Sequence, residues 1–176
     1  MQPLKIHKGK LLLLSHEAAL VADPLCRDAL DRAEDGELGP DAQRIVASIG
    51  ASGPRSADQV RTAVGLPAPA FRAARERLES EGAIVARYPV QPGGQVEQIR
   101  RSATLARWDQ SFTQRRKAPL QHALDDLVVL GVRAAVVVQE DEPKTWFTWP
   151  IVYDTVRRLL ETGRLVRPGA GWVAAA

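Results

Sequence analysis

The amino-acid sequence predicts an α-rich α+β protein made of two similar units, in each of which helices precede a short β-hairpin. Two observations carry this prediction. Apolar residues recur at helical spacing in several segments bounded by Gly and Pro. Two of these segments run directly into β-forming residues around a glycine-containing turn, EGAIVARYPVQPGGQVEQIR (residues 81–100) and RLVRPGAGWVAAA (residues 164–176).

Composition limits the kinds of protein this can be. The chain has 176 residues, 45% hydrophobic and 26% charged, which is typical of one ordinary globular domain or two very small ones. Its net charge of +3 is compatible with an anionic partner. One cysteine, Cys26, and three dispersed histidines exclude an internal disulfide and predict no metal site. The run Leu11–Leu14 is too short to span a membrane and lacks the features of a signal peptide, so we expect a cytoplasmic protein.

Residues 1–38 are predicted to form an N-terminal extension of strand and helix. The run KIHKGKLLLLS fits one short strand, although its four leucines fit a turn of core helix about as well. Ser15 is placed to cap a following helix. We expect Pro24 to interrupt that helix, because proline removes a backbone hydrogen bond, and a second short helix to cover Pro24–Ala33.

The first unit, residues 39–108, contains three helices predicted from apolar spacing. Residues 41–51 place their apolar side chains on one face. A second helix begins at Ser56, which is spaced to form a capping box with Gln59, and it ends at a glycine. A longer third helix covers residues 69–81.

A β-hairpin follows the third helix, with Ile84–Val90 and Val96–Ile99 as its strands. Gly93 and Gly94 in the turn permit the positive φ angles that tight turns need. Helix, capped helix, longer helix and hairpin, in this order, are typical of a winged-helix domain. In such a domain the third helix lies in the DNA major groove, and the hairpin, called the wing, reaches a neighbouring groove or the phosphates.

A basic connector, SATLARWDQSFTQRRKA (residues 102–118), leads out of the first unit, and its part 109–118 separates the two predicted domains. The second unit, residues 119–176, begins with a helix. Val136–Val138 either extend this helix or form a strand. After an acidic loop, a helix over residues 151–162 leads into the second hairpin, so the sequence predicts tandem winged helix-turn-helix modules with small β-hairpin wings.

Three stretches, KGKLLLLS, GPDAQRIVASIGASGPRSADQVRTAVGL and FRAARERLESEGAIV, resemble the winged-helix proteins related to the AlkZ/YcaQ DNA glycosylases, over residues 8–108. The resemblance implies tandem winged helices that excise alkylated or cross-linked bases from DNA. The active glycosylases carry a Gln-apolar-Gln or Gln-apolar-Asp motif. The nearest match here, Gln139-Glu140-Asp141, has an acidic middle residue, and this chain is shorter than the three-domain glycosylases. The resemblance therefore assigns no catalytic residue.

The expected DNA contacts are six polar residues on the third helix and its wing: Arg72, Arg77, Arg87, Gln95, Arg100 and Arg101. The two helix arginines fit phosphates, or a guanine edge, although Glu76 between them repels phosphate. Arginines on the wing fit a narrow groove, but a solvated hairpin that only stabilises its domain fits the same residues. The run Arg115-Arg116-Lys117 either follows a DNA backbone or is solvated.

Other conspicuous residues have structural interpretations. Arg75 falls beside the apolar face of the third helix and is expected to pack there. The Asp125-Asp126 pair is interpreted as surface, because nothing nearby supplies a partner, and Cys26 as buried and inert. The tryptophans of the second unit are expected to pack between the units rather than stack on bases: Trp146, Trp149 and Trp172.

These features predict a protein that binds double-stranded DNA mainly through its backbone, in DNA repair or regulation, without a cofactor or a membrane. Two alternatives stay open. One is a compact DNA glycosylase, which only the resemblance implies. The other is a module that binds a protein partner. Mixed charges on the candidate helices favour it, because Glu76, Asp154 and Glu161 oppose close contact with phosphate.

Overall fold

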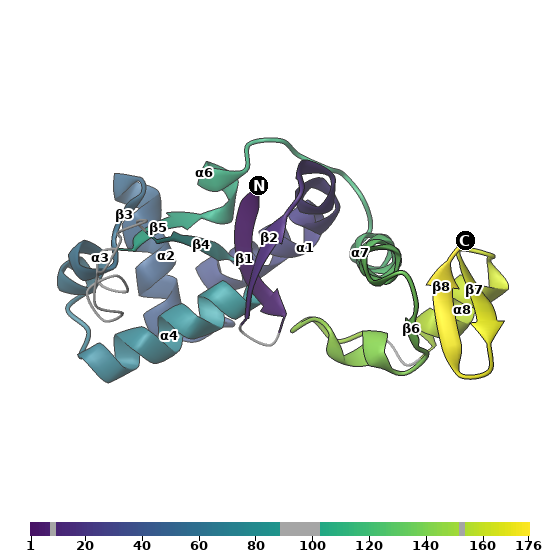
Figure 1. Cartoon of the computed structure of the whole chain (residues 1–176). Helices are drawn as coiled ribbons and strands as arrows, with labels where there is room; N and C mark the ends of the chain where they lie inside the picture. Colours follow the sequence, from purple (N-terminus) through teal and green to yellow (C-terminus); the bar gives the residue numbers. More distant parts are fainter. Residues whose placement is uncertain (8–9, 89–102, 152–153) are drawn as a thin grey trace.

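A computed structural model confirms an α-rich α+β protein with small antiparallel sheets (Figure 1). The structure describes residues 1–7, 10–88, 103–151 and 154–176. In Figure 1 the first unit lies on the left and the C-terminal sheet on the right, with the N-terminal hairpin and the first helix between them. None of the helices in these ranges is long and apolar enough to cross a bilayer.

The N-terminal residues form two antiparallel strands, β1 (Gln2–His7) and β2 (Lys10–Leu14), instead of the single strand that we expected. Leu4 and Leu14 are buried, whereas Leu13 is 61% exposed. Successive side chains of a strand point to opposite faces. A run of identical leucines carries no alternation, so the sequence could not show which of them face the core.

Helix α1 (His16–Glu34) is continuous, so the interruption expected at Pro24 is wrong. Ser15 caps the helix as predicted, because its Oγ accepts a hydrogen bond from a first-turn amide at 3.1 Å. Proline inside a helix costs about 3 kcal/mol. Burial of Leu25 and Leu30 on the inner face of α1, worth about 1.5–3 kcal/mol for each side chain, offsets that cost.

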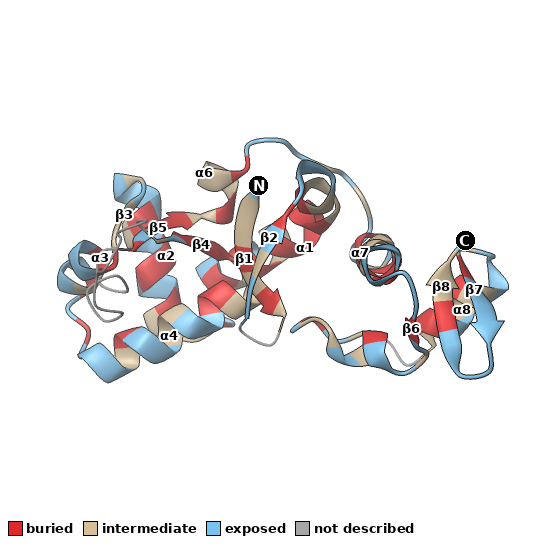
Figure 2. Cartoon of the chain, in the orientation of Figure 1, coloured by how far each residue is buried: buried red, intermediate tan, exposed pale blue. Residues whose placement is uncertain are grey.

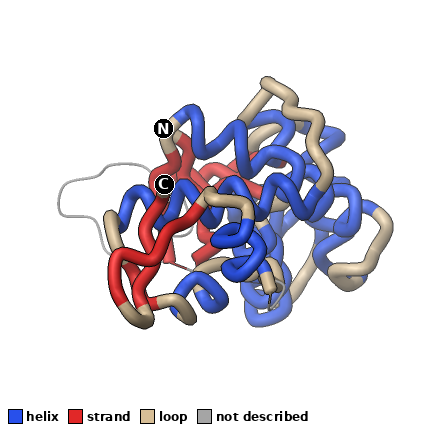
Figure 3. Tube along the Cα trace, turned by 90° about the vertical axis from the view of Figure 1, so that its right-hand side faces the viewer, coloured by secondary structure: helices blue, strands red, loops and turns tan. Residues whose placement is uncertain are grey.

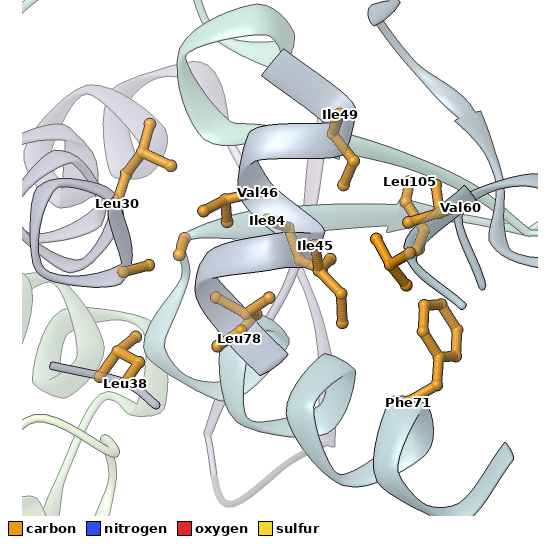
Figure 4. Close-up of a cluster of buried hydrophobic side chains, with 14 of the residues drawn as sticks. Leu30, Leu38, Ile45, Val46, Ile49, Val60, Phe71, Leu78, Ile84 and Leu105 are labelled. Carbon is orange, nitrogen blue, oxygen red and sulfur yellow. The ribbon is translucent and has the colours of Figure 1, made fainter. Parts of the chain in front are cut away.

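Three helices enclose the core of the first unit: α2 (Pro40–Ser52), α3 (Ala57–Val64) and α4 (Ala68–Glu81). The predicted capping box of α3 is confirmed. Ser56 Oγ accepts from the Gln59 amide at 3.3 Å, and the Gln59 side chain accepts from the Ser56 amide at 3.0 Å. Side chains of these helices and of the adjoining strands meet in one apolar core (Figure 4), which includes Ile45, Val46, Ile49, Val60, Phe71, Leu78, Ile84 and Leu105.

The sheet of the first unit has the order β3-β5-β4, where β3 is Arg55–Ser56, β4 is Ile84–Arg87 and β5 is Thr104–Arg107. The second strand that we expected, Val96–Ile99, lies outside the described residues. Within them, the strand that pairs with β4 is β5, which the sequence placed in the basic connector. Leu105 is fully buried in the core, and this burial accounts for the strand.

Helix α7 (Leu120–Ala135) opens the second unit, and the structure decides between the alternatives left open at Val136–Val138. The helix stops and strand β6 (Val138–Gln139) follows. Between them Val136 has φ 69° and ψ −56°, and the next amide donates back to Ala135 O at 2.9 Å. This is a γ-turn, and a β-branched residue at positive φ is strained there.

The second unit continues with a 3₁₀ turn, η1 (Glu142–Thr145), and helix α8 (Thr155–Glu161). It ends in a hairpin of β7 (Leu165–Gly169) and β8 (Trp172–Ala175), which confirms the predicted second hairpin. Strand β8 pairs with both β6 and β7. The order β6-β8-β7 therefore repeats the order β3-β5-β4, and its strands face the viewer in Figure 3.

A shared apolar cluster joins the two units through the N-terminal hairpin, α1, α7 and a short helix, α6 (Trp108–Ser111). Trp108 and Trp149 are buried in this cluster, so the packing role expected for Trp149 is confirmed. The chain after η1 returns to β1, where the Thr148 amide donates to Ile6 O at 2.9 Å. Red segments in the middle of Figure 2 mark this junction.

Two interpretations from the sequence are wrong. Trp172 is 43% exposed and does not pack between the units. Asp125 is 5% exposed, and its Oδ1 accepts a hydrogen bond from Arg158 Nη2 at 2.7 Å. Asp126 likewise accepts from Arg164 Nη2 at 2.6 Å. Both arginines lie far along the chain, in α8 and just after it, so sequence proximity could not reveal these partners.

Candidate nucleic-acid interface

Helix α4 presents a polar face to solvent because the core occupies its apolar face. Phe71 and Leu78, two turns apart, are buried. Arg72 and Arg77 are exposed on the other side, as the helical spacing predicts. Gly82 ends the helix in the left-handed region, with φ 81°, which sets the direction of the chain into β4.

The guanidinium groups of Arg72 and Arg77 form no ion pair or hydrogen bond with any residue in the part of the chain that the structure describes. Glu76 lies between them in the helix and is also exposed. Both arginines therefore offer their planar, five-donor groups to solvent. That geometry matches the oxygens of a phosphate.

A second group of charges lies where α4 meets β1 and the end of β4. Glu79 is 2% exposed, and its carboxylate binds the ammonium of Lys5 and Nε of Arg75, the latter at 2.5 Å. The Tyr88 hydroxyl accepts from Lys5 Nζ at 2.7 Å and from Arg75 Nη2 at 3.1 Å. The two cations lie 5.3 and 5.9 Å from the ring centroid of Tyr88. Arg75 thus packs beside the apolar face, as expected.

The environment of Lys5 keeps its ammonium charged. Burial lowers the pKa of Lys5, but hydrogen bonds and charge interactions with Glu79 and Tyr88 raise it further, so that this pKa lies above its ordinary value. The Lys5 side chain therefore stays a cation at neutral pH.

These residues line a hollow of about 310 Å³ beside α4. Phe71 and Tyr88 contribute its aromatic surface. Four cations and three carboxylates give the lining one net positive charge. These charged residues are Lys5, Asp58, Arg61, Arg72, Arg75, Glu76 and Glu79.

Arg87 lies at the end of β4 and is exposed. Its Nη2 donates to Gln2 Oε1 at 3.4 Å. Arg87 and Tyr88 are consecutive in an extended segment, so their side chains point to opposite sides. Because Tyr88 points toward α4, the structure does not bring Arg87 together with Arg72.

The remaining predicted contacts, Gln95, Arg100 and Arg101, lie outside the described residues. Of the six, the structure places three: Arg87 at the end of β4, and Arg72 and Arg77, which lie five residues apart at the two edges of the exposed face of α4.

In the basic run Arg115-Arg116-Lys117 of the connector, the middle residue makes contacts within the protein. The Arg116 amide donates to the buried Asp23 carboxylate at 2.9 Å, and the Arg116 guanidinium pairs with Asp126. Arg115 and Lys117 on either side are exposed. Only the flanking cations of this run are therefore presented to a partner.

The arginines of the second unit's helix α8 and hairpin are paired with carboxylates. Arg167 donates to both oxygens of Glu140, at 2.9 and 2.6 Å, so the middle residue of Gln139-Glu140-Asp141 has a structural contact. The other pairs are Arg157 with Asp154 and Glu161, Arg158 with Asp125, and Arg164 with Asp126.

Residues 1–118 contain 18 Lys and Arg against 14 Asp and Glu, whereas residues 119–176 contain six against seven. The excess of positive charge thus belongs to the first part of the chain.

Nothing in the described ranges resembles a metal centre, because no three His, Cys, Asp or Glu side chains gather there. Cys26 is fully buried, and burial raises the pKa of its thiol well above the ordinary value. A thiol held neutral in the core is a poor nucleophile. The expectation that Cys26 is buried is confirmed.

Sequence reasoning missed Lys5, Glu79 and Tyr88. Arg75 and Glu79 are four residues apart on a helix, which is a visible signal for an ion pair. Lys5 gives no such signal, because β1 reaches α4 only in the folded chain. The sequence predicts Tyr88 within a strand, and the polar contacts of Tyr88 depend on where that strand ends.

In comparisons with known proteins, no family model, curated protein or solved structure matches this chain.

Proposed function

We propose that the protein binds double-stranded DNA through helix α4 and the adjoining hairpin, mainly by contacts to the phosphate backbone. The observation that carries the proposal is the state of Arg72 and Arg77, which are exposed and unpaired within the described structure on a helix fixed by its opposite face. Neutralising phosphates with such arginines releases counterions, the main source of affinity in nonspecific DNA binding. Glu76 between them repels phosphate, so the proposed backbone contacts depend on the two arginines that flank this one carboxylate.

The order of elements supports a winged-helix assignment for the first unit. Helices α2, α3 and α4 precede the strands β4 and β5, and the short strand β3 joins their sheet. In that domain class the third helix, here α4, contacts the major groove. The second unit repeats the pattern with α7, β6, α8, β7 and β8, and we extend the assignment to it.

Substitution of the two α4 arginines tests this function. We expect Arg72→Ala with Arg77→Ala to weaken binding of a labelled duplex at least tenfold at low salt, because each substitution leaves one phosphate without its cation. Arg72→Lys with Arg77→Lys should retain most of the affinity, since a point charge suffices for a backbone contact. Arg157→Ala removes an exposed arginine of α8 that already pairs with Asp154 and Glu161, so this control should bind like the wild type. Equal affinity for all four proteins would exclude α4 as the DNA-binding element.

The second unit favours a second candidate function, binding to a protein. Val166 and Trp172 are 44% and 43% exposed. Val166 pairs with Ala174, two residues from Trp172, so both side chains lie on the outer face of the C-terminal sheet. An exposed tryptophan beside aliphatic residues is typical of protein interfaces. A purified partner that binds the wild type but not Trp172→Glu would support this function, and a partner that binds both equally would contradict it.

A further inference from the structure

Among the residues that the structure describes, the Tyr88 hydroxyl has a hydrogen to donate and no hydrogen-bond acceptor within reach. It accepts hydrogen bonds from Lys5 Nζ at 2.7 Å and from Arg75 Nη2 at 3.1 Å. Ammonium and guanidinium groups are donors only, so neither can take the proton of the hydroxyl. No other residue in the described ranges accepts from Tyr88. Two cationic donors also polarise this O–H bond, which makes the hydroxyl a strong donor toward an acceptor that enters the hollow beside α4.

The buried Glu79 fixes this arrangement. Its carboxylate holds Lys5 and Arg75 at the same time, and its side chain is 3% exposed. Because both cations are held by an almost fully buried group, the Tyr88 hydroxyl they bind is oriented before any ligand arrives. Binding then costs little reordering of side chains.

The charge of the hollow selects a singly charged anion. Its lining carries one net positive charge, with Arg61 and Arg72 at the rim alongside Asp58 and Glu76. A diester phosphate carries one negative charge, whereas a monoester carries about 1.5 to 2 at neutral pH, and inorganic phosphate is a mixture of the monoanion and the dianion. The rim carboxylates disfavour the second negative charge by repulsion.

We propose that this hollow is a site for one phosphate group, with the Tyr88 hydroxyl as its neutral donor and Arg72 as its cationic partner. The identification of this phosphate as a phosphodiester of duplex DNA rests on the proposed function of α4. The site adds residues outside the exposed face of α4 to the interface, and it places one phosphate at a fixed position beside the helix.

The first test is Tyr88→Phe, which removes only the hydroxyl. We expect duplex affinity to fall about tenfold, the lower end of the range for a hydrogen bond to a charged group. The slope of log affinity against log salt should stay unchanged, because the substitution removes no charge. Arg72→Ala should make this negative slope less steep, by about 0.9. An exposed hydroxyl on α3 supplies the matched control, since Thr62→Val should bind like the wild type.

The second test uses the wild-type protein and small ligands, so that it does not depend on the stability of a variant. Dimethyl phosphate and inorganic phosphate are titrated separately while the NMR signals of the Tyr88 ring are followed. We expect both ligands to shift these signals, the diester at lower concentration.

Duplex binding without any effect of Tyr88→Phe and without such shifts would overturn the site and leave the proposed function standing. Shifts with phosphate but no duplex binding would keep the site, identify a free phosphate as its ligand and overturn the proposed function. Absence of both would overturn both.

Discussion

The ammonium of Lys5 and the carboxylate of Glu79 form an ion pair that joins the first strand of the chain to helix α4. Arg75 binds the same carboxylate, which is nearly excluded from solvent. The N-terminal hairpin therefore fixes the orientation of the helix that carries the candidate DNA contacts.

Removal of this carboxylate should destabilise the fold. Glu79→Ala leaves two partly buried cations without their shared partner, and breaking a buried pair in this way costs about 3–5 kcal/mol of unfolding free energy. Urea denaturation measures the change. The matched control is Glu76→Ala on the exposed face of the same helix, which should stay within about 0.5 kcal/mol of the wild type. Similar losses of unfolding free energy for both variants would show that Glu79 stabilises the fold no more than an exposed carboxylate does.

Removal of the exposed carboxylate should instead strengthen DNA binding. Glu76→Gln eliminates a negative charge between Arg72 and Arg77 without changing the core. We expect duplex affinity to rise by roughly two- to fivefold at low salt, because the repulsion is between solvent-exposed charges, and the gain to vanish at high salt. Fluorescence anisotropy with a labelled duplex measures it. Unchanged affinity at low salt would mean that this face does not approach phosphates.

The Asp126 carboxylate should contribute stability that depends on pH. Burial raises its pKa, but hydrogen bonds and charge interactions with Arg116 and Arg164 lower it more, so the folded-state pKa lies below the ordinary value. A depressed carboxyl pKa stabilises the fold above the unfolded-state pKa of about 3.9 and loses this effect as the pH falls through the folded-state value. Asp126→Asn should thus be less stable than the wild type at pH 7, and the difference should shrink below about pH 4. Urea melts at several pH values test this, and a constant difference would argue against the ion pairs.

Relief of backbone strain should stabilise the second unit. Val136 has φ 69° and is 74% exposed, so its side chain contributes little burial. Glycine adopts positive φ without a steric cost, and Val136→Gly should raise the unfolding free energy by about 1 kcal/mol after its own entropic cost. The neighbouring Val137→Gly, outside the positive-φ region, is the control and should be neutral or destabilising. A destabilised Val136→Gly would indicate that the γ-turn is not strained.

Local signals in the sequence predicted the helices of the first unit well. The capping box at Ser56 and the apolar spacing of α2 and α4 depend on residues three or four positions apart, which a sequence displays directly. Elements that depend on distant contacts were missed. Pro24 lies inside α1 because tertiary burial outweighs its local cost, and β5 forms because Leu105 reaches the core.

The candidate site shows the same limit. The exposure of Arg72 and Arg77 follows from a helical wheel once Phe71 and Leu78 are assigned to the core. The link between Lys5 and Glu79 requires the N-terminal hairpin to lie against α4, which no local pattern specifies. Lys5, Glu79 and Tyr88, which add the hollow beside α4 to the exposed face of this helix, could therefore be identified only in the structure.

The most direct test of DNA binding by α4 is the salt dependence of wild-type affinity for a labelled duplex, measured by fluorescence anisotropy. Contacts from Arg72 and Arg77 predict that log affinity falls linearly with log salt, with a slope of about −1.8 or steeper, since each neutralised phosphate contributes about −0.9. Absence of binding at the lowest salt concentration, or an affinity that does not change with salt, would contradict DNA binding by α4.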